Sequence, residues 1–274
     1  MEVSSLIVVK LGGTTVAGQE AVLTEIAAQA RTRPMVVVHG GGVQVTEWLG
    51  RLGVPTHFED GLRVTDAAAI EVVAAVLRGA VNTTLVAALR IRGADAVGLS
   101  GVDGGLLIAE RTPGKGFVAT VVDIRRSLID ALLVDGRVPV VAPLALDETG
   151  TVCNVNADDV AAGLARGLGA ERLVLMTDSD GVLDAEGRRI TSLQAAEVEP
   201  LVADGTIGTG MVPKVRSALS AVAGGSAGSV VIADGSAPRA LERALSGDDV
   251  GTRIVADDQP PTDPAAVRAS RDRR

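Results

Sequence analysis

Short, continuously apolar runs alternate with longer amphipathic stretches along most of the sequence. The apolar runs predict buried strands at Leu6–Val9, Met35–Val38, Val138–Ala142, Leu173–Met176, Val230–Ala233 and Ile254–Val255. The stretches between them predict helices near residues 19–31, 43–52, 66–91, 125–134, 157–168, 194–204, 214–223 and 237–245. Strands that are apolar throughout are typical of a parallel sheet covered by helices. We therefore expect an α/β protein with a mainly parallel central sheet.

One stretch interrupts this alternation. Gly98–Ile124 is rich in glycine and contains short β-like runs at residues 106–108 and 117–122. Such runs between turn-forming residues suggest hairpins. We expect these hairpins to cover one side of a site.

A second change of composition, near residues 170–190, marks a loop at the end of a strand. We place a boundary just before this loop, between an N-terminal lobe of residues 1–171 and a C-terminal lobe of residues 172–257. Residues 258–274 have no apolar periodicity, so we expect a disordered tail there.

Composition and charge exclude several classes of protein. The formal net charge of −8 argues against sequence-independent binding to nucleic acid, which needs a broad basic surface. The single cysteine, Cys153, excludes an intrachain disulfide and fits a reducing compartment. No apolar run approaches about 18 residues, and no basic leader with a cleavage site is seen at the N-terminus. We therefore expect a cytoplasmic protein without a membrane span.

Lysine is rare in this sequence. Only Lys10, Lys115 and Lys214 occur among the 26 basic residues, and the rest are arginine. Lysine offers a compact ammonium charge on a flexible stem, whereas arginine presents a broad planar fork. Lys10 and Lys214 stand beside glycine-rich turns, where a phosphate could be held. The alternative is that three lysines are left by chance in an arginine-rich composition.

A run of three glycines follows the predicted strand Met35–Val38, in the motif H-G-G-G of residues 39–42. Glycines at the end of a strand and the start of a helix let backbone N–H groups approach an anion closely. The motif is neither a Walker A sequence nor a G-x-G-x-x-G fingerprint. Gly12 and Gly13, after Lys10, repeat the arrangement. We expect an anion site here, although a tight structural turn would also use one or two of the glycines.

Polar residues gather at two further turns. Arg63, in G-L-R-V-T-D, can bind a carboxylate through two parallel hydrogen bonds, although a solvated surface arginine is the alternative. Asn154, Asn156 and Asp158 precede a predicted helix. Asn156 or Asp158 can cap that helix. Alternatively, Asn154 binds a polar group of a substrate and Asp158 orients nearby lysines.

The segments Thr177–Gly181 and Thr206–Lys214 could form a nucleotide pocket, although the first can also be an ordinary β-turn.

His39 and His57, the only histidines, have no cysteine or paired histidine near them in sequence, so a zinc site is not expected. No G-x-S-x-G motif occurs, and Cys153 lacks the signature of a catalytic thiol. We expect Cys153 to be a small buried residue.

Seven motifs in order resemble the amino acid kinase family: V-V-K-L-G-G, V-V-V-H-G-G-G, G-L-R-V-T-D, N-V-N-A-D, T-D-S-D-G-V-L-D, G-M-V-P-K and G-T-R-I. Each motif alone is weak, but seven in this order and spacing, from Leu6 to Val255, are highly specific. The resemblance implies a three-layer α/β/α fold with two lobes. Within the family, the chain is most similar to members that transfer the γ-phosphoryl group of MgATP to the side-chain carboxylate of N-acetyl-L-glutamate, a step of arginine biosynthesis.

The resemblance also implies a role for each motif. Lys10 and Lys214 would flank the transferred phosphoryl group, and Asp158 would hold both lysines in place. The acyl amino acid would be bound in the N-terminal lobe by Gly41, Gly42, Arg63 and Asn154. ATP would be bound in the C-terminal lobe by Gly12, Gly13, Asp178, Ser179, Asp180, Gly181, Val182, Leu183, Thr206, Ile207 and Gly208. Mg²⁺ would be held mainly by the phosphates of ATP, without a metal site in the protein.

Two alternatives within the same fold remain. One is a kinase that acts on carrier-protein-bound aminoadipate or glutamate in lysine or ornithine biosynthesis, and the other is a non-catalytic nucleotide sensor. Carbamate kinase and aspartokinase fit the acceptor motifs less well.

The pair Asn82-Thr83 departs from the family, in which a lysine would follow the asparagine. Because arginine-inhibited hexameric relatives carry an extra N-terminal helix and only five residues precede Leu6, we expect a homodimer without that feedback.

Overall fold

The computed structural model describes residues 6–12, 20–59 and 61–257, and an eight-stranded sheet forms its centre. The strand order is β12 (Ser192–Gln194), β14 (Thr252–Val255), β13 (Val230–Asp234), β11 (Arg172–Thr177), β1 (Ile7–Leu11), β2 (Met35–His39), β8 (Val138–Ala142) and β5 (Ala96–Ser100). All neighbouring strands are parallel except β13 and β14. The predicted mainly parallel sheet is therefore confirmed.

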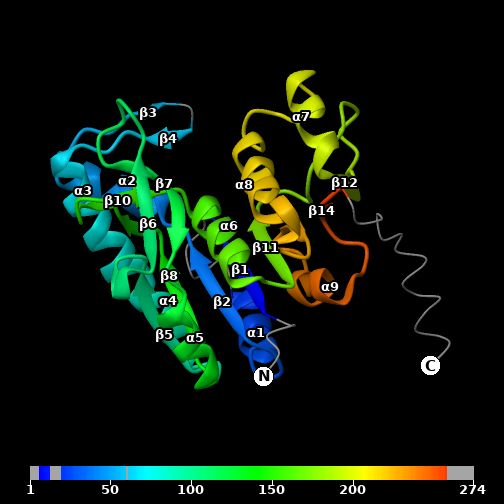
Figure 1. The fold of residues 1–274 in the computed structure, drawn as a ribbon, viewed down its shortest axis with the longest axis horizontal. Helices are drawn as coiled ribbons and strands as arrows, with labels where there is room; N and C mark the ends of the chain where they lie inside the picture. The colour runs from blue at the N-terminus through cyan, green and yellow to red at the C-terminus, as the bar shows by residue number, and fades with distance from the viewer. Residues whose placement is uncertain (1–5, 13–19, 60, 258–274) are drawn as a thin grey trace.

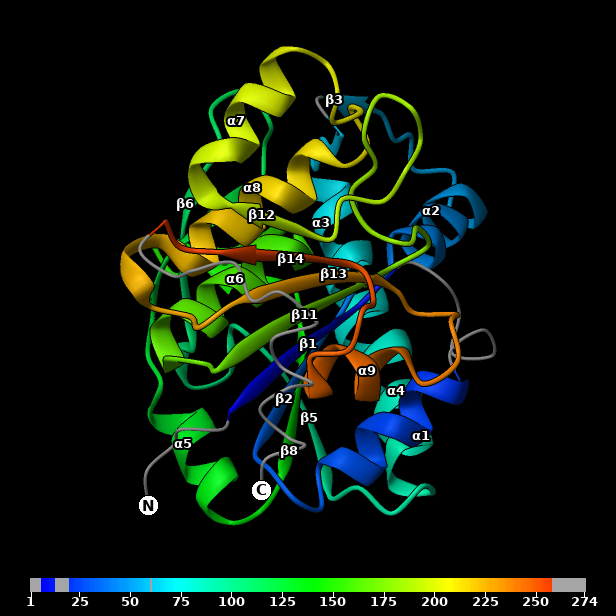
Figure 2. The same cartoon turned by 90° about the vertical axis from the view of Figure 1, so that its right-hand side faces the viewer.

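Helices cover both faces of this sheet (Figures 1 and 2). One face carries α1 (Glu20–Gln29), α4 (Asn82–Arg90) and α9 (Ala240–Ser246). The other carries α5 (Ser127–Val134), α6 (Ala157–Leu168), α7 (Ala195–Ala203) and α8 (Val212–Val222). Alternate residues of a strand point to opposite faces, so Val8 of β1 joins the core under α6 while Ile7 and Val9 join the core under α1. The three-layer α/β/α fold implied by the resemblance is confirmed.

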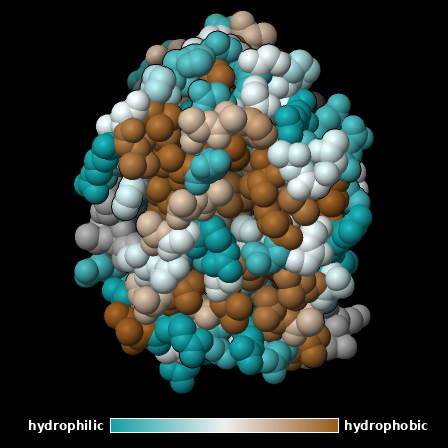
Figure 3. Space-filling model, turned by 90° about the vertical axis from the view of Figure 1, so that its left-hand side faces the viewer, coloured by the Kyte–Doolittle hydropathy of each residue, from teal (hydrophilic) through white to brown (hydrophobic). Residues whose placement is uncertain are grey.

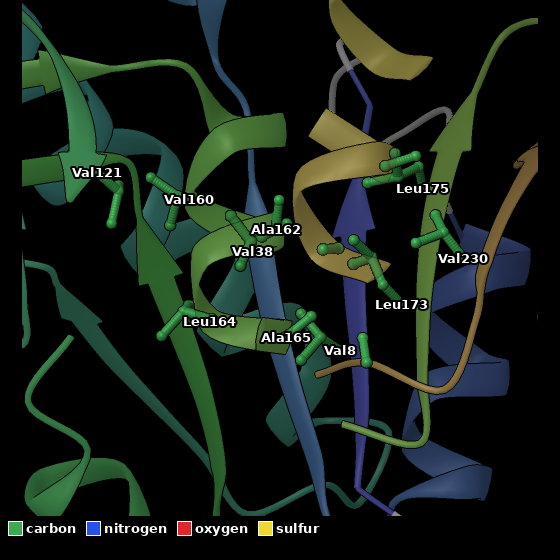
Figure 4. Close-up of a cluster of buried hydrophobic side chains, with 14 of the residues drawn as sticks. Val8, Val38, Val121, Val160, Ala162, Leu164, Ala165, Leu173, Leu175 and Val230 are labelled. Carbon is green, nitrogen blue, oxygen red and sulfur yellow. The ribbon is translucent and has the colours of Figure 1, made fainter. Parts of the chain in front are cut away.

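Helix α6 lies at the centre of the molecule and is apolar over most of its surface. Figure 4 shows Val160, Ala162 and Leu164 of this helix among buried side chains of the sheet. Asn156 caps its N-terminus, because the Asn156 side chain accepts a 2.7 Å hydrogen bond from the backbone N–H of Asp158. The cap assigned to Asn156 or Asp158 from the sequence is therefore made by Asn156. Asp158, in the first turn, is left with its carboxylate available for other contacts.

A closed four-stranded barrel stands beside the sheet in the N-terminal half. It contains β6 (Leu107–Arg111), β7 (Val118–Ile124), β9 (Leu144–Leu146) and β10 (Val152–Val155). The predicted hairpin corresponds to the antiparallel pair β6–β7. The sequence did not indicate β9, β10 or the edge strand β5. Cys153 of β10 is buried in the core, as expected.

The predicted helix of residues 66–91 is continuous, but it changes pitch along its length. It consists of α3 (Ala67–Ala74), the π-helical segment η2 (Ala75–Val81) and α4 (Asn82–Arg90). The Asp66 side chain caps it by accepting a 2.8 Å hydrogen bond from the N–H of Ala69. By length and composition alone this 24-residue helix could cross a membrane, which the sequence analysis did not anticipate. Its inner side packs against β5 and β8 in the core of the α/β fold.

The remaining elements connect these layers. They are α2 (Gly42–Arg51), the hairpin of β3 (Phe58–Glu59) and β4 (Leu62–Arg63), and the short turns η3 (Asp103–Gly105) and η4 (Ala223–Gly225). The boundary placed before residue 172 falls between β1 and β11, which are hydrogen-bonded neighbours in one sheet. The predicted tail, residues 258–274, lies outside the described residues.

Candidate active site

A cavity of about 310 Å³ opens between the glycine loop after β2, the β3–β4 hairpin, the barrel and the N-termini of α6 and α8. All residues predicted to be catalytic or to bind the acceptor line it: Lys10, Gly41, Gly42, Arg63, Asn154, Asp158 and Lys214. These residues come from positions as far apart as β1 and α8. The structure thus brings both predicted sets to one place.

The two lysines contact the same carboxylate. The Nζ atom of Lys10 lies 2.8 Å from Oδ1 of Asp158, and the Nζ atom of Lys214 lies 3.4 Å from Oδ2. The side chains of Lys10 and Asp158 are 8% and 6% exposed, and that of Lys214 is 23% exposed. Asp158 therefore holds the two ammonium groups beside one another at the edge of the cavity.

The charges of the trio Lys10, Lys214 and Asp158 leave a net positive charge in the cavity. Burial by itself raises the pKa of Asp158, but the charges of Lys10 and Lys214 outweigh it and keep the pKa below the ordinary value. Asp158 is thus ionised at neutral pH. Two ammonium groups and one carboxylate have a net charge of about +1, and the side chains of Lys10 and Asp158 are largely buried. Such an arrangement can attract and hold an anion such as a phosphate.

The local fold explains this convergence. Lys10 stands near the carboxyl end of the central strand β1, and in parallel sheets ligand sites form outside the carboxyl ends of the strands. Asp158 and Lys214 each lie in the first turn of a helix, α6 and α8. Pro213 precedes Lys214 at the start of α8, where a proline fits without breaking the helix.

The glycine loop brings the N-terminus of a helix to the same cavity. Gly41 is the N-cap of α2, and no side chain caps this helix end. A Cβ atom at Gly41 would stand 2.6 Å from Cδ2 of Leu77, in the π-helical segment. The lack of a side chain therefore lets the loop lie directly against η2. Uncapped N–H groups at a helix N-terminus are suited to bind an anion.

Arg63 is buried and fixed, so it is not the solvated surface residue that the sequence left open. Its guanidinium donates to Oγ1 of Thr56 at 2.7 Å, to Oγ1 of Thr46 at 2.6 Å and to the carbonyl of Gly42 at 3.0 Å. The Phe58 ring stacks on it, 4.6 Å from the ring centre. Burial lowers its pKa from the ordinary value. Within the described part of the chain no carboxylate pairs with Arg63, which leaves its charge for a ligand.

The remaining wall of the cavity is mostly apolar. Asn154, the fourth predicted acceptor residue, donates to Oγ1 of Thr65 at 3.1 Å. Around it lie side chains that the sequence analysis did not select: Val45, Phe58, Leu62, Val73, Leu77, Val118 and Pro143. Leu62 belongs to the same motif as Arg63, but the others carry no recognisable local signal. They become neighbours only when the barrel and the π-helical segment fold.

Behind the glycine loop, His39 and Asn82 form a buried pair. The Nδ1 atom of His39 lies 2.6 Å from the carbonyl of Gly40, and its Nε2 lies 3.0 Å from Nδ2 of Asn82. Nδ2 of Asn82 also donates to the carbonyl of Val140 at 2.9 Å. These contacts fit a neutral ring with its proton on Nδ1. Burial lowers the pKa of His39 to about 4, which agrees with that form.

The residues predicted to bind the nucleotide lie outside the lining of this cavity. Those at 178–183 form the loop after β11, whose carboxyl end is beside that of β1. Val182 is buried there and its N–H donates to Oγ1 of Thr252 at 2.8 Å, while Asp180 pairs with Arg189 at 3.4 Å. Thr206, Ile207 and Gly208 lead to α8, and the Ile207 side chain is in the core.

Two glycines complete the predicted nucleotide set. Gly12 closes β1, and a Cβ atom there would stand 2.6 Å from the carbonyl oxygen of Met176. Gly13 lies outside the described residues. The nucleotide role of this whole set stays a prediction.

Comparison with known proteins identifies the family. Residues 5–234 match the model of the amino acid kinase family. The acetylglutamate kinase of Synechococcus sp. (strain JA-2-3B'a(2-13)) is 42% identical over 261 residues, which cover 91% of this chain and 83% of that protein. The acetylglutamate kinase of Solibacter usitatus (strain Ellin6076) is 44% identical over 254 residues, which cover 91% of this chain and 98% of that protein.

A solved structure agrees at the level of the fold. The carbamate kinase from Giardia lamblia bound to AMP-PNP has a TM-score of 0.67 with 17% sequence identity, covering 92% of this chain and 99% of that one. Fold, site and sequence therefore define a small-molecule kinase, and the chain belongs to the amino acid kinase family. The family resemblance carried by the seven motifs is confirmed.

Proposed function

We propose that the protein is an acetylglutamate kinase, which transfers the γ-phosphoryl group of ATP to the side-chain carboxylate of N-acetyl-L-glutamate. The product is N-acetyl-L-glutamyl 5-phosphate. The observation that carries this proposal is the contact of Lys10 and Lys214 with the single carboxylate of Asp158, in a cavity that also contains the charge of Arg63. The curated relatives at 42% and 44% identity carry this activity in their names.

The acceptor half of the cavity suits an acylated amino acid. Arg63 would bind the α-carboxylate, since its guanidinium is buried and has no acidic partner within the described residues. Asn154 and the backbone N–H groups of Gly41 and Gly42 would bind the amide and the reacting carboxylate. The apolar wall formed by Val73 and Leu77 would accept the methyl and methylene groups. A free α-amino group would be poorly placed against such a wall, which favours an acylated substrate.

The chemistry requires no general base. A carboxylate acceptor is already ionised at neutral pH, so no proton has to be removed before attack. Catalysis then depends on positioning and on neutralising the charge of the transferred phosphoryl group. The ammonium groups of Lys10 and Lys214 would lie on either side of this group, and Asp158 holds them near each other. Because both are fixed before the reaction, they stabilise the transition state at little cost in reorganisation.

Mg²⁺ would be carried by the phosphates of the nucleotide, as the family resemblance implies. The described residues contain no group of three or more His, Cys, Asp and Glu side chains placed to hold a metal ion. Asp158 is engaged by two ammonium groups, so its oxygens are already occupied. The residues at 178–183 and 206–208, with Gly12 and Gly13, would hold ATP on the C-terminal side. Mg²⁺ bound to the phosphates would supply further neutralisation of their negative charge.

A substrate comparison tests this function. ATP consumption by the purified protein would be measured with N-acetyl-L-glutamate, N-acetyl-L-aminoadipate, aspartate and bicarbonate with ammonia. We expect N-acetyl-L-glutamate to give the highest kcat/KM. A preference for a carrier-protein-bound acceptor would assign the protein to the neighbouring branch of the family. Binding of ATP without turnover on any acceptor would identify a nucleotide sensor.

We further infer a cytoplasmic homodimer that forms through the outer face of the helix Ala67–Arg90. This face presents small exposed residues at Ala75, Gly79, Thr83 and Ala87 on successive turns, and at Ala68 beyond the exposed Glu71. The surface around it has broad apolar patches (Figure 3). Exposed apolar patches of this kind mark interaction sites, and a two-fold axis would pair each helix with its copy.

A further inference from the structure

Besides the contact of Lys214 with Asp158, two hydrogen bonds of the described residues connect α6, which carries Asp158, with α8, which carries Lys214. The hydroxyl of Ser217 lies 2.6 Å from Oδ1 of Asp159, the residue after Asp158. Farther along the same pair of helices, Nη1 of Arg166 on α6 donates to Oγ of Ser220 on α8 at 3.0 Å. Ser217 is one helical turn beyond Lys214, whereas Ser220 is nearly two turns beyond it. The first hydrogen bond therefore lies beside the lysines and the second lies away from them.

The spacing of these two helices determines one of the two lysine contacts. Lys10 comes from β1 and reaches Asp158 at 2.8 Å, but Lys214 comes from α8 and reaches it at 3.4 Å. A small movement of α8 away from α6 would therefore detach Lys214 first. Lysine is long and flexible, so its own rotamers do little to fix the ammonium group. The contact between Ser217 and Asp159 fixes the helix turn from which Lys214 projects.

The hydrogen bond between Ser217 and Asp159 can be formed with the proton on either residue. The Oγ atom of Ser217 lies 2.6 Å from Asp159 and also 3.0 Å from the carbonyl oxygen of Pro213. A serine hydroxyl has one hydrogen, and a carbonyl oxygen cannot donate. A Ser217 hydroxyl that donates to an ionised Asp159 has to share its hydrogen with the carbonyl of Pro213. A protonated Asp159 carboxyl group instead donates to Ser217, which then donates to Pro213 without sharing. The sequence did not single out either Asp159 or Ser217.

We propose that Asp159 and Ser217 are positioning residues for Lys214, joined by a protonated carboxyl group at Asp159. This inference rests on the proposed kinase function. Neither residue lines the cavity, and each acts through the helix that carries a catalytic residue. The proton also removes a second negative charge from the neighbourhood of Asp158, so Lys10 and Lys214 stay bound to one carboxylate.

The charges around Asp159 agree with this protonated form. Burial raises the pKa of Asp159, and the neighbouring charge of Asp158 raises it further, against the opposing effect of the Ser217 hydrogen bond. The other charged groups at this junction are Lys214 on α8 and Lys10 on β1, and both are already bound to Asp158. No ammonium group contacts Asp159 among the ion pairs of the described residues.

A matched pair of serine variants tests the positioning role. Ser217→Ala and Ser220→Ala each remove one hydrogen bond between α6 and α8. We expect Ser217→Ala to lower kcat about 10-fold with little change in KM for N-acetyl-L-glutamate, because a displaced catalytic group slows the chemical step. Ser220→Ala should keep kcat within about two-fold of wild type. Equal kcat values for the two variants would overturn the proposal.

Further variants distinguish a failure to fold from a loss of catalysis. If Ser217→Ala does not fold, Asp159→Ala removes the same hydrogen bond at a side chain that is only partly buried, and the same loss of kcat is expected. Asp159→Asn keeps a neutral donor and should retain wild-type kcat. An inactive wild-type protein would refute the proposed function together with this inference, whereas an active wild type with an unaffected Ser217→Ala variant refutes the inference alone.

The proton can be observed without any assay of activity. Infrared spectra at neutral pH should contain a C=O band of a protonated carboxyl group that is absent from the Asp159→Asn variant. If that band is missing from the wild-type protein, Asp159 is ionised and the protonated link is wrong.

Discussion

Asp158 is a carboxylate that tolerates burial because two ammonium groups contact it. Removing one partner of a buried charge pair is costly, because the other charge is left uncompensated. The sequence indicated this trio from the rarity of lysine and from the motif around Asp158. The hydrogen bonds of Arg63 with Thr46 and Thr56 were not predictable in the same way, since neither threonine stands in a motif with the arginine.

Lys214→Ala should lower kcat by at least about 10²-fold, the scale of losing one donor to the transition state. KM for N-acetyl-L-glutamate should change little, because Arg63 and Asn154 are unaffected. Steady-state kinetics measure both values. Arg216→Ala is the control on the same helix, since Arg216 is exposed and pairs with Glu199. Nearly unchanged turnover in the Lys214→Ala variant would remove this lysine from the mechanism.

His39 should make the stability of the protein depend on pH in the acidic range. Its pKa falls from 6.5 in the unfolded chain to about 4 in the folded protein. Between these values the unfolded chain binds a proton that the folded protein does not, so the free energy of unfolding decreases as the pH falls. The loss approaches about 3 kcal/mol near pH 4. Urea unfolding from about pH 7 to pH 4 measures it.

The matched control for this effect is the other histidine. His39→Gln should lack the additional acid destabilisation, although it is less stable at neutral pH. His57→Gln should retain it, because the His57 side chain is 66% exposed. Parallel pH dependence of the wild type and the His39→Gln variant would contradict the prediction.

At the scale of elements, continuously apolar strands and long amphipathic helices were predictable. The barrel strands β9 and β10 were not, since three or four residues carry too little periodicity and their burial depends on the barrel. The edge strand β5 was not predictable either, because Gly98 interrupts its apolar run and it is only partly buried. The π-helical segment η2 was also not predictable. Ala75–Val81 alone reads as ordinary helix, and the close approach of Leu77 to the glycine loop exists only in the folded protein.

Gly12→Ala should disturb the junction of β1 and β11. The added Cβ would stand 2.6 Å from the backbone oxygen of Met176, so one of the strands has to move. We expect a loss of about 1–3 kcal/mol in stability and a lower kcat, because Lys10 is two residues away. Thermal unfolding and kinetics measure the two effects.

Gly50→Ala is the control for the size of the substitution. Gly50 lies within α2, and nothing lies within 4 Å of an added Cβ. Alanine should stabilise this helix by up to about 1 kcal/mol. Equal stability of the two variants would show that the junction of β1 and β11 tolerates a side chain.

At the scale of the whole molecule, we expect a dimer in solution. Light scattering should give about twice the 27.7 kDa of one chain. Ala75→Arg places a charged, bulky side chain on the exposed face of the long helix and should give monomers. Ala28→Arg, on the surface of α1, should leave the dimer intact. A monomeric wild type, or a dimeric Ala75→Arg variant, would refute this interface.

The position of β1 beside β11 limits how the enzyme can respond to its substrates. β1 belongs to the proposed N-terminal lobe and β11 to the C-terminal lobe, and the two strands form one continuous ladder of backbone hydrogen bonds. In this ladder Val8 lies opposite Leu173 and Lys10 lies opposite Leu175. A hinge that swung the lobes apart would have to rupture this ladder. Closure around two substrates must therefore arise from altered twist between neighbouring strands, which gives small, elastic rotations in place of a wide opening.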